Sequence, residues 1–277
     1  MGQQNSENLN GVSGLPRKEQ KVRYMTLKSL IPAAILTTTL IFSSLPLAIR
    51  AEGPPAAASN ATATATLSGT VKFEGEAPKR TPLKMAADPS CGKQHPNPAL
   101  SEDLVIDQKG GLQNVIVFIA DGLGDRTFES PSEPVVIHQK GCMYEPHVLA
   151  MSANQRLEVV NDDPTTHNIH PIPVNNREWN KSESPGSKAE ETFAREEIAI
   201  PVKCNIHPWM KGYVAVLKHP FFAATAEDGS FHLTGLPPGT YTVEAWHEKL
   251  GKSTQKITVA AHETKAITFT FKPKPGA

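Results

Sequence analysis

The stretch Cys204-Asn-Ile-His207-Pro-Trp-Met210 determines more about this chain than any other, because it places three metal-binding side chains at three-residue steps. A thiolate with imidazole nitrogens suits copper or zinc, and a thioether as the next donor favours copper, since Met is a poor ligand for zinc. A copper site with these donors needs two histidines, one cysteine and a weakly bound methionine. One histidine must therefore come from another part of the chain.

A second stretch, Pro164-Thr-Thr-His167-Asn-Ile-His170, can supply the missing histidine. It follows residues 157–160, Leu-Glu-Val-Val, which have the composition of a strand. His167 and His170 compete for the role of ligand, and on a strand the two side chains would point in opposite directions. The pairing of this stretch with residues 204–210 predicts a type 1, or blue, copper site.

Both stretches resemble the ligand loops of the cupredoxins, and within that family those of the amicyanin-like and plastocyanin-like proteins. The C-x2-H-x2-M spacing is similar to the short ligand loop of amicyanin, and the His167-Asn168 pair is similar to the family's upstream ligand and its neighbour. The resemblance covers roughly residues 135–217 and implies a Greek-key β-sandwich that holds one copper ion. The implied ligands are His167, Cys204, His207 and Met210.

The same resemblance implies roles for the residues beside the ligands. Asn168 would tie the two ligand loops together, and His207 would be exposed at the edge of the fold. Pro208 and Trp209 would then offer a small apolar patch beside His207, on which a redox partner could dock. Contacts between electron-transfer proteins are usually small and transient.

An ordinary structural interpretation of these residues competes with the metal site. A cysteine in a β protein is usually a small buried hydrophobe or half of a disulfide, and a nearby methionine usually fills core space. A lone histidine is more often a hydrogen-bonded polar group than a ligand. Three donor types at fixed spacing and a second histidine stretch favour copper, with zinc behind it because of Met210.

The composition of the whole chain favours an all-β protein. Its 28 basic and 28 acidic residues give no net charge, and no basic run indicates binding to nucleic acid. The 277 residues include 24 Pro and 19 Gly, and the apolar runs are short, which favours many short strands joined by tight turns.

Residues 1–51 are expected to direct export rather than to fold. Basic residues precede an apolar run over 30–49, which is the pattern of a secretory signal with cleavage after Ala51. An uncleaved membrane anchor is the alternative, since a span needs about 17–25 apolar residues, but the prolines in the run weaken it. Residues 52–66, rich in Pro, Ala and Thr, are expected to form a disordered linker. The protein should therefore be periplasmic or lie at the cell surface.

The three cysteines leave one unpaired if a single disulfide forms in an oxidising compartment. If Cys204 is a metal thiolate, Cys91 and Cys142 are free to form that disulfide. The alternative is that Cys204 pairs with one of the other two, which would abolish the copper site.

Residues 225–246 carry a different pattern of strands and tight turns. Asp228-Gly229 indicates a hairpin, and Pro237-Pro-Gly239 indicates a second turn. The pattern resembles the carboxypeptidase regulatory-like (transthyretin-like) β-sandwich, a family that usually begins with a Gly-Thr-Val strand. Residues 69–71 have that sequence far upstream.

The two resemblances together predict the domain organisation. We expect residues 67–132 and 219–277 to be two parts of one carboxypeptidase regulatory-like sandwich. The cupredoxin domain, residues 133–218, would be inserted between them, and a plain tandem arrangement is the alternative.

Several other polar residues are interpreted as structural. His147 is expected to be an ordinary surface or strand residue, with a place beside the metal ligands as the alternative, and His247 and Glu248 are expected to be solvated at a strand end. Asp162 and Asp163 are expected to cap a turn. Residues 175–190 should form a surface loop and 80–103 a long irregular excursion.

The predicted function is electron transfer rather than catalysis. Cys204 is flanked by Lys203 and Asn205, whereas a second copper centre would need extra histidines there. We therefore expect an exported type 1 copper protein, not an enzyme, that carries single electrons between redox partner proteins. The alternative is an extracytoplasmic β-sandwich binding module in which copper is structural or stored. Membrane contact is expected only if the N-terminal segment stays uncleaved.

Overall fold

The computed structural model describes residues 63–273, which fall in one compact unit of the chain. These residues form strands in four sheets, together with a 3-10 turn, η1 (Met85–Ala87), and a four-residue helix, α1 (Pro89–Gly92). The expectation of an all-β protein is confirmed. The proposed export segment and most of the proposed linker lie outside the described residues, and within 63–273 no helix is long and apolar enough to cross a membrane.

Two of the sheets contain strands from both ends of the described chain, and we call this pair the split sandwich. One sheet has the strand order β13-β1-β16 and the other the order β12-β2-β14-β15. The strands are β1 (Ala65–Phe73), β2 (Ile116–Asp121), β12 (Phe222–Ala224), β13 (Ser230–Leu236), β14 (Gly239–His247), β15 (Gly251–Val259) and β16 (Thr264–Phe271).

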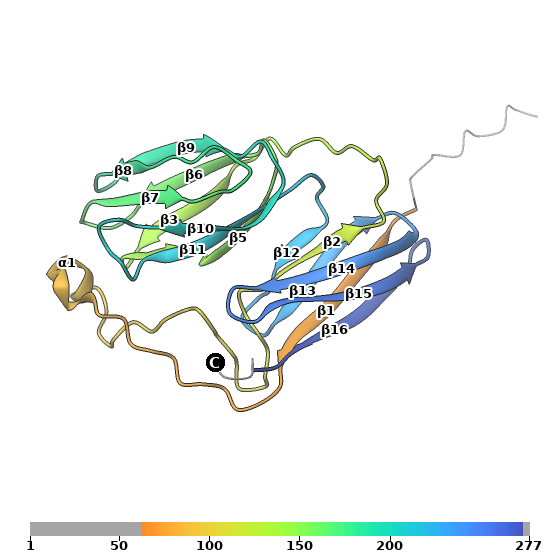
Figure 1. The fold of residues 1–277 in the computed structure, drawn as a ribbon, viewed down its shortest axis with the longest axis horizontal. Coiled ribbons are helices and arrows are strands. Elements are labelled where there is room, and N and C mark those ends of the chain that lie inside the picture. Colours follow the sequence, from red (N-terminus) through yellow and green to blue (C-terminus); the bar gives the residue numbers. More distant parts are fainter. Residues whose placement is uncertain (1–62, 274–277) are drawn as a thin grey trace, which may run out of the picture. The chain divides into compact units, whose positions relative to one another are not determined.

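β1 is the first strand of the split sandwich, and it pairs with β16, the last strand. It runs parallel to β16 from the Thr66–Thr264 pair onward and antiparallel to β13, so that the orange and dark blue strands lie side by side in Figure 1. Gly69 allows this close pairing, because a Cβ atom there would lie 2.3 Å from the carbonyl oxygen of Ile267 and 2.6 Å from the ring of Phe231. β1 begins two residues earlier than the sequence predicts.

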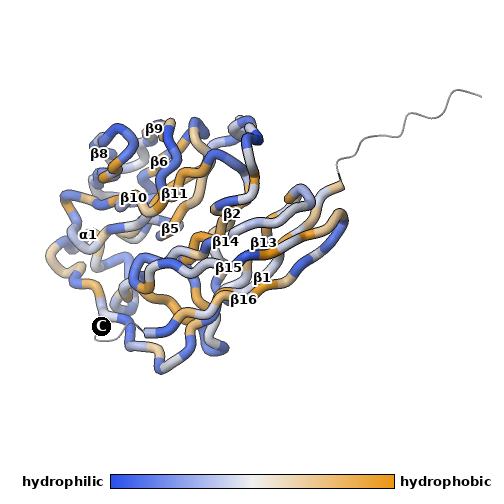
Figure 2. Tube along the Cα trace, turned by 45° about the vertical axis from the view of Figure 1, so that its right-hand side comes forward, coloured by the Kyte–Doolittle hydropathy of each residue, from blue (hydrophilic) through white to orange (hydrophobic). Residues whose placement is uncertain are grey.

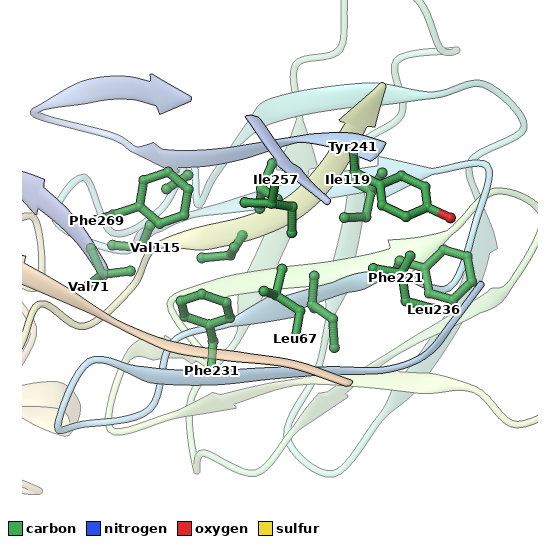
Figure 3. Close-up of a cluster of buried hydrophobic side chains, with 14 of the residues drawn as sticks. Leu67, Val71, Val115, Ile119, Phe221, Phe231, Leu236, Tyr241, Ile257 and Phe269 are labelled. Atoms are coloured by element: carbon green, nitrogen blue, oxygen red, sulfur yellow. The ribbon is translucent and has the colours of Figure 1, made fainter. Parts of the chain in front are cut away.

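The core of the split sandwich lies between its two sheets. Hydrophobic and hydrophilic residues alternate along strands such as β14 and β16, as the period of a half-buried strand requires (Figure 2). The inward side chains come from both sheets and interdigitate (Figure 3). They include Leu67, Val71, Ile119, Phe231, Tyr241, Ile257 and Phe269.

The other two sheets, which we call the central sandwich, are built from strands between residues 135 and 217. Their strand orders are β5-β11-β10-β7-β8 and β4-β3-β6-β9. The strands are β3 (Val135–Lys140), β4 (Met143–Glu145), β5 (Val148–Ser152), β6 (Arg156–Asn161), β7 (His167–Pro171), β8 (Lys181–Glu183), β9 (Lys188–Thr192), β10 (Glu197–Lys203) and β11 (Lys211–Leu217). Its core contains Ile137, Leu157, Val159, Ile169, Ile200, Val202 and Val214.

The expectation of a surface loop over 175–190 is wrong. β8 and the beginning of β9 lie there, and β9 pairs antiparallel with β6 along residues 188–192. β9 is an edge strand whose residues are exposed or half-buried, so its polar sequence lacks the hydrophobic alternation by which strands are recognised.

The two sandwiches also pack against each other. A third apolar cluster joins Ile116 and Phe118 of β2 to Val148 of β5 and Leu217 of β11. Beside it, His147 of the central sandwich bonds to Glu248, which follows β14 of the split sandwich.

The expectation that His147 is an ordinary surface or strand residue, and that His247 and Glu248 are solvated, is therefore wrong. The side chains of His147 and Glu248 are 2% and 3% exposed, and His247 is fully buried. Sequence could not show this, because the two hydrogen-bonded partners come from different sandwiches and each looks like an ordinary solvated residue.

We expect the close contact of β1, β13 and β16 to depend on Phe231. Replacing Phe231, which is buried, with Ala should lower the free energy of unfolding by about 3–5 kcal/mol through the cavity that it leaves. His232→Ala is the matched control, because His232 is the next residue on β13 and is exposed. Urea unfolding of the two variants checks this, and equal effects would contradict the assignment of the two faces of β13.

Candidate metal centre

His167, Cys204 and His207 meet at a buried point in the central sandwich. His167 opens β7, and the other two lie in the ligand loop, residues 204–210, which joins β10 to β11. The Nδ1 atoms of His167 and His207 are 2.9 Å apart, and Cys204 Sγ is 3.8 Å from His207 Nδ1. All three residues are at most 3% exposed. The structure thus brings together residues 37 and 40 positions apart in the sequence.

Met210 closes the ligand loop. Its backbone N–H donates to the carbonyl of His207, and its carbonyl accepts from the N–H of Cys204. Met210 is 1% exposed and belongs to the same hydrophobic cluster as Cys204. Of the two competing histidines upstream, His170 lies on the other side of β7, where it bonds to Glu178 and Asn205.

Two carboxylates that were not expected at the candidate site hold the histidines. Asp163 Oδ2 accepts from Nε2 of His167 at 2.8 Å, and Asp88 Oδ2 accepts from Nε2 of His207 at 3.0 Å. Asp163 also accepts from the backbone N–H groups of Gly141 and Cys142, both at 2.7 Å. Burial raises the pKa of Asp163, but the hydrogen bond from His167 and these backbone donors outweigh burial and lower it. The expectation that Asp163 caps a turn misses this contact with His167.

These contacts determine which ring nitrogens carry protons. A neutral imidazole has one N–H, and the other nitrogen is an acceptor. In both histidines Nε2 donates to a carboxylate, so the two Nδ1 atoms face each other 2.9 Å apart beside a sulfur atom. Burial lowers the pKa of His167, but its hydrogen bonds to Asp163 and Cys204 outweigh burial and raise this pKa to about 9, so that a proton on His167 Nδ1 lies among these atoms in the metal-free protein at neutral pH. Three electron-pair donors that converge in a buried site repel one another unless a cation or proton lies among them.

The sulfur of Cys204 lies among polar groups despite its burial. The backbone N–H of His207 points at Sγ from 3.4 Å, and Sγ lies 3.3 Å from Oδ1 of Asn168. Burial raises the pKa of the Cys204 thiol, but hydrogen bonds from His167 and from backbone N–H groups outweigh burial and lower it to about 6. The thiolate, which is the form that binds metals, is therefore favoured at neutral pH.

Asn168 connects the two stretches that carry the donors. Its Oδ1 accepts from the backbone N–H of Asn205 at 2.6 Å, and its Nδ2 donates to Asn180. This amide therefore joins β7 to the ligand loop, which is the place that the sequence resemblance implies for it.

The 80–103 region, which we call the covering segment, lies against the ligand loop. Cys91 of this segment forms a disulfide with Cys142, and Cys204 is the free cysteine of the described residues. The indole N–H of Trp209 donates to the carbonyl of Cys142.

The expectation that His207 is exposed at the edge of the fold is wrong. The side chain of His207 is 2% exposed, because Asp88 of the covering segment contacts its outer nitrogen. Pro208 is exposed but Trp209 is half-buried against the disulfide cluster. The covering segment thus occupies the side of the ligand loop where a docking patch was expected.

The donor set fits a soft or borderline metal ion. One thiolate and two neutral imidazoles are typical ligands of copper and zinc, and the buried thioether beside them suits copper better. Cys204, His167 and His207 form one of the groups in the described residues whose ligand atoms all lie within 4.8 Å of one another.

Comparison with known proteins gives one family match. Residues 214–272 match the sequence model of the carboxypeptidase regulatory-like domain. This confirms the resemblance seen in residues 225–246. Comparison with curated proteins gives no match.

Solved structures that resemble part of the chain include cupredoxins. The purple cupredoxin from Nitrosopumilus maritimus matches at 27% identity and a TM-score of 0.26, over 29% of this chain and 97% of that one. A Cu(I) form of amicyanin matches at 19% identity and a TM-score of 0.28, over 36% and 97%. A copper-containing nitrite reductase from Thermus scotoductus matches at 25% identity and a TM-score of 0.30, over 35% of this chain and only a quarter of the enzyme's length.

Near the candidate centre, Glu183 and Gln139 form a buried polar pair. Gln139 Nε2 donates to Glu183 Oε2 at 3.0 Å, whereas Oε1 of each residue is buried without a hydrogen-bond partner. A buried carboxylate oxygen without a donor disfavours the charged form of Glu183. Burial is the main reason why the pKa of Glu183 is raised to about 7.

The raised pKa of Glu183 predicts a pH dependence of stability. The stabilising effect of the protonated form is complete below the ordinary pKa of 4.5 and is lost as the pH rises through about 7. Glu183→Gln removes this ionisation, so the metal-free variant should lose about 2 kcal/mol less than the wild type between pH 4.5 and 7.

Urea unfolding at several pH values measures this difference. The control is Glu190→Gln on β9, where the side chain is exposed. A Glu183→Gln variant with the same pH dependence as the wild type would show that Glu183 is ionised throughout.

Proposed function

We propose that this chain is an exported type 1 copper protein that carries single electrons between redox partners. The observation that supports this most is the convergence of two Nδ1 atoms and the Cys204 sulfur on one buried point, with both Nε2 atoms bonded to carboxylates. A metal ion would displace the proton that lies among these three atoms in the metal-free protein. In this proposal, residues 133–218 form the copper domain, inserted between residues 67–132 and 219–277.

Each ligand has a distinct part in the proposed site. His167, Cys204 and His207 would hold the ion, and Met210 would be the weak fourth ligand that tunes its reduction potential. A copper ion held in this way supplies one-electron redox chemistry. The backbone N–H of His207 donates to the sulfur and would help to hold it in place when the charge of the site changes.

The closed surroundings of the site support electron transfer rather than catalysis. The cavity that adjoins Trp209 and Met210 has a volume of about 10 Å³, which is room for one water molecule but not for an organic substrate. All three convergent donors are buried.

A second candidate function is favoured by the covered His207. A protein that stores copper or uses it structurally does not need an exposed ligand edge, and here Asp88 and the disulfide cluster close that edge. The two functions differ in whether the bound ion cycles reversibly between its two oxidation states.

The export of the protein is supported by its cysteines. A disulfide between Cys91 and Cys142 persists in oxidising compartments such as the periplasm. Together with the basic and apolar pattern of residues 1–51, it supports a periplasmic or cell-surface location.

We predict different effects for the two sulfur ligands of the loop. Cys204→Ser should abolish the intense thiolate-to-copper absorption, whereas Met210→Leu should retain it and raise the reduction potential, since only the weak ligand is lost. Optical spectroscopy and redox titration of copper-loaded variants measure both effects.

Met151→Leu is the matched control, because Met151 is equally buried in the same core but lies on β5, outside the ligand loop. It should leave both band and potential unchanged, since Leu and Met have similar volumes. An intense band in the Cys204→Ser variant would refute the ligand assignment. A band that cannot be reduced and reoxidised reversibly would favour storage.

A further inference from the structure

We propose that Asp88 is a positioning residue, which orients the proposed metal ligand His207. Asp88 belongs to the covering segment, the part of the chain between β1 and β2 of the split sandwich that lies over His207. This inference rests on the proposed function, because it assigns a partner to one of the proposed ligands. Asp88 lies 119 positions before His207 in the sequence.

The covering segment is attached to the central sandwich at several points around Asp88. The Cys91–Cys142 disulfide ties it covalently to the turn between β3 and β4. His95 bonds to the carbonyl of Gly141 in the same turn. Met85 and the two half-cystines are buried together, with Trp209 of the ligand loop packed against them.

The carboxylate of Asp88 is held in one orientation. Its Oδ1 accepts from the backbone N–H of Ser90 at 2.8 Å and from the Ser90 hydroxyl at 2.6 Å, at the beginning of α1. These bonds leave Oδ2 for His207 Nε2. The ring of His207 is thereby locked with its N–H outward and its Nδ1 toward Cys204 and His167.

Asp88 also adds a negative charge close to the proposed ion. With the Cys204 thiolate and Asp163, it makes three anionic groups around one site, and within residues 63–273 neither aspartate forms an ion pair with a lysine or arginine. Such surroundings stabilise Cu(II) more than Cu(I), because the higher charge interacts more strongly with each anion. The side chain of Asp88 is 28% exposed, so solvent weakens this effect without removing it.

Hydrogen-bond partners of metal-binding histidines generally raise ligand basicity, and their loss costs about 10–100-fold in metal affinity. If Asp88 served only to hold the covering segment in place, its loss would loosen that segment without changing which nitrogen of the His207 ring carries the proton. The two roles can therefore be separated by variants that change one and keep the other.

Asp88→Asn is the test variant, because asparagine keeps the shape and an oxygen that can cap α1 but removes the charge. Ser90→Ala is the matched control, since it loses a hydrogen bond within the covering segment while Asp88 still reaches His207. Both are made in the full chain.

The first measurement needs no metal. Nitrogen NMR of the histidine rings in the metal-free protein should show His207 protonated at Nε2 in the wild type and in Ser90→Ala. In Asp88→Asn, the form protonated at Nδ1 should become populated. A wild-type His207 protonated at Nδ1, or the same ring state in all three proteins, would overturn the proposal.

The second measurement is the reduction potential of the copper-loaded proteins. If Asp88→Asn weakens Cu(II) binding tenfold relative to Cu(I), the potential rises by about 59 mV for one electron. Equal shifts in Asp88→Asn and Ser90→Ala would show that loosening of the segment, not the Asp88 carboxylate, is responsible, and would overturn the proposal. A wild type without a copper–thiolate band would instead refute the proposed function, while the NMR result would still decide the role of Asp88.

Discussion

The candidate site depends on two imidazole rings whose Nε2 atoms, on the side away from Cys204, each donate a hydrogen bond to a carboxylate. Asp163 takes the N–H of His167 and Asp88 takes that of His207. As a result, both Nδ1 atoms face the sulfur of Cys204 at a buried point. Buried polar atoms are costly unless they are paired, so a proton or a cation among these three atoms would stabilise the arrangement.

The two sandwiches have complementary parts in building this arrangement. The central sandwich supplies the convergent donors, because β7 starts at His167 and the β10–β11 hairpin carries the ligand loop. The split sandwich supplies the covering segment, which leaves β1, crosses the ligand loop and returns to β2.

The sequence was sufficient for the parts of the site that are close together in the chain. The spacing of Cys204, His207 and Met210 is local. Strand alternation indicated that His167 and His170 point in opposite directions, and the resemblance of the His167-Asn168 order to the cupredoxins favoured His167. The all-β class and most strands could be predicted from apolar alternation and turn residues. β8 and β9 could not, because edge strands with polar residues lack that alternation.

The surroundings of the ligands could not be predicted in the same way. Asp88 looks like any aspartate before a proline, and only the folded chain brings it to His207. The family resemblance implied an open edge at His207, whereas the covering segment here closes it. His147 and Glu248 likewise look solvated in sequence and are buried as a pair.

The measurement that tests the central claim most directly is a titration of the wild-type, metal-free full chain with Cu(II), followed by its optical spectrum. We predict an intense thiolate-to-copper band that grows to one equivalent and then stops, with the Cys91–Cys142 disulfide intact. A protein that binds copper without this band, or whose Cys204 is found in a disulfide, would contradict this prediction.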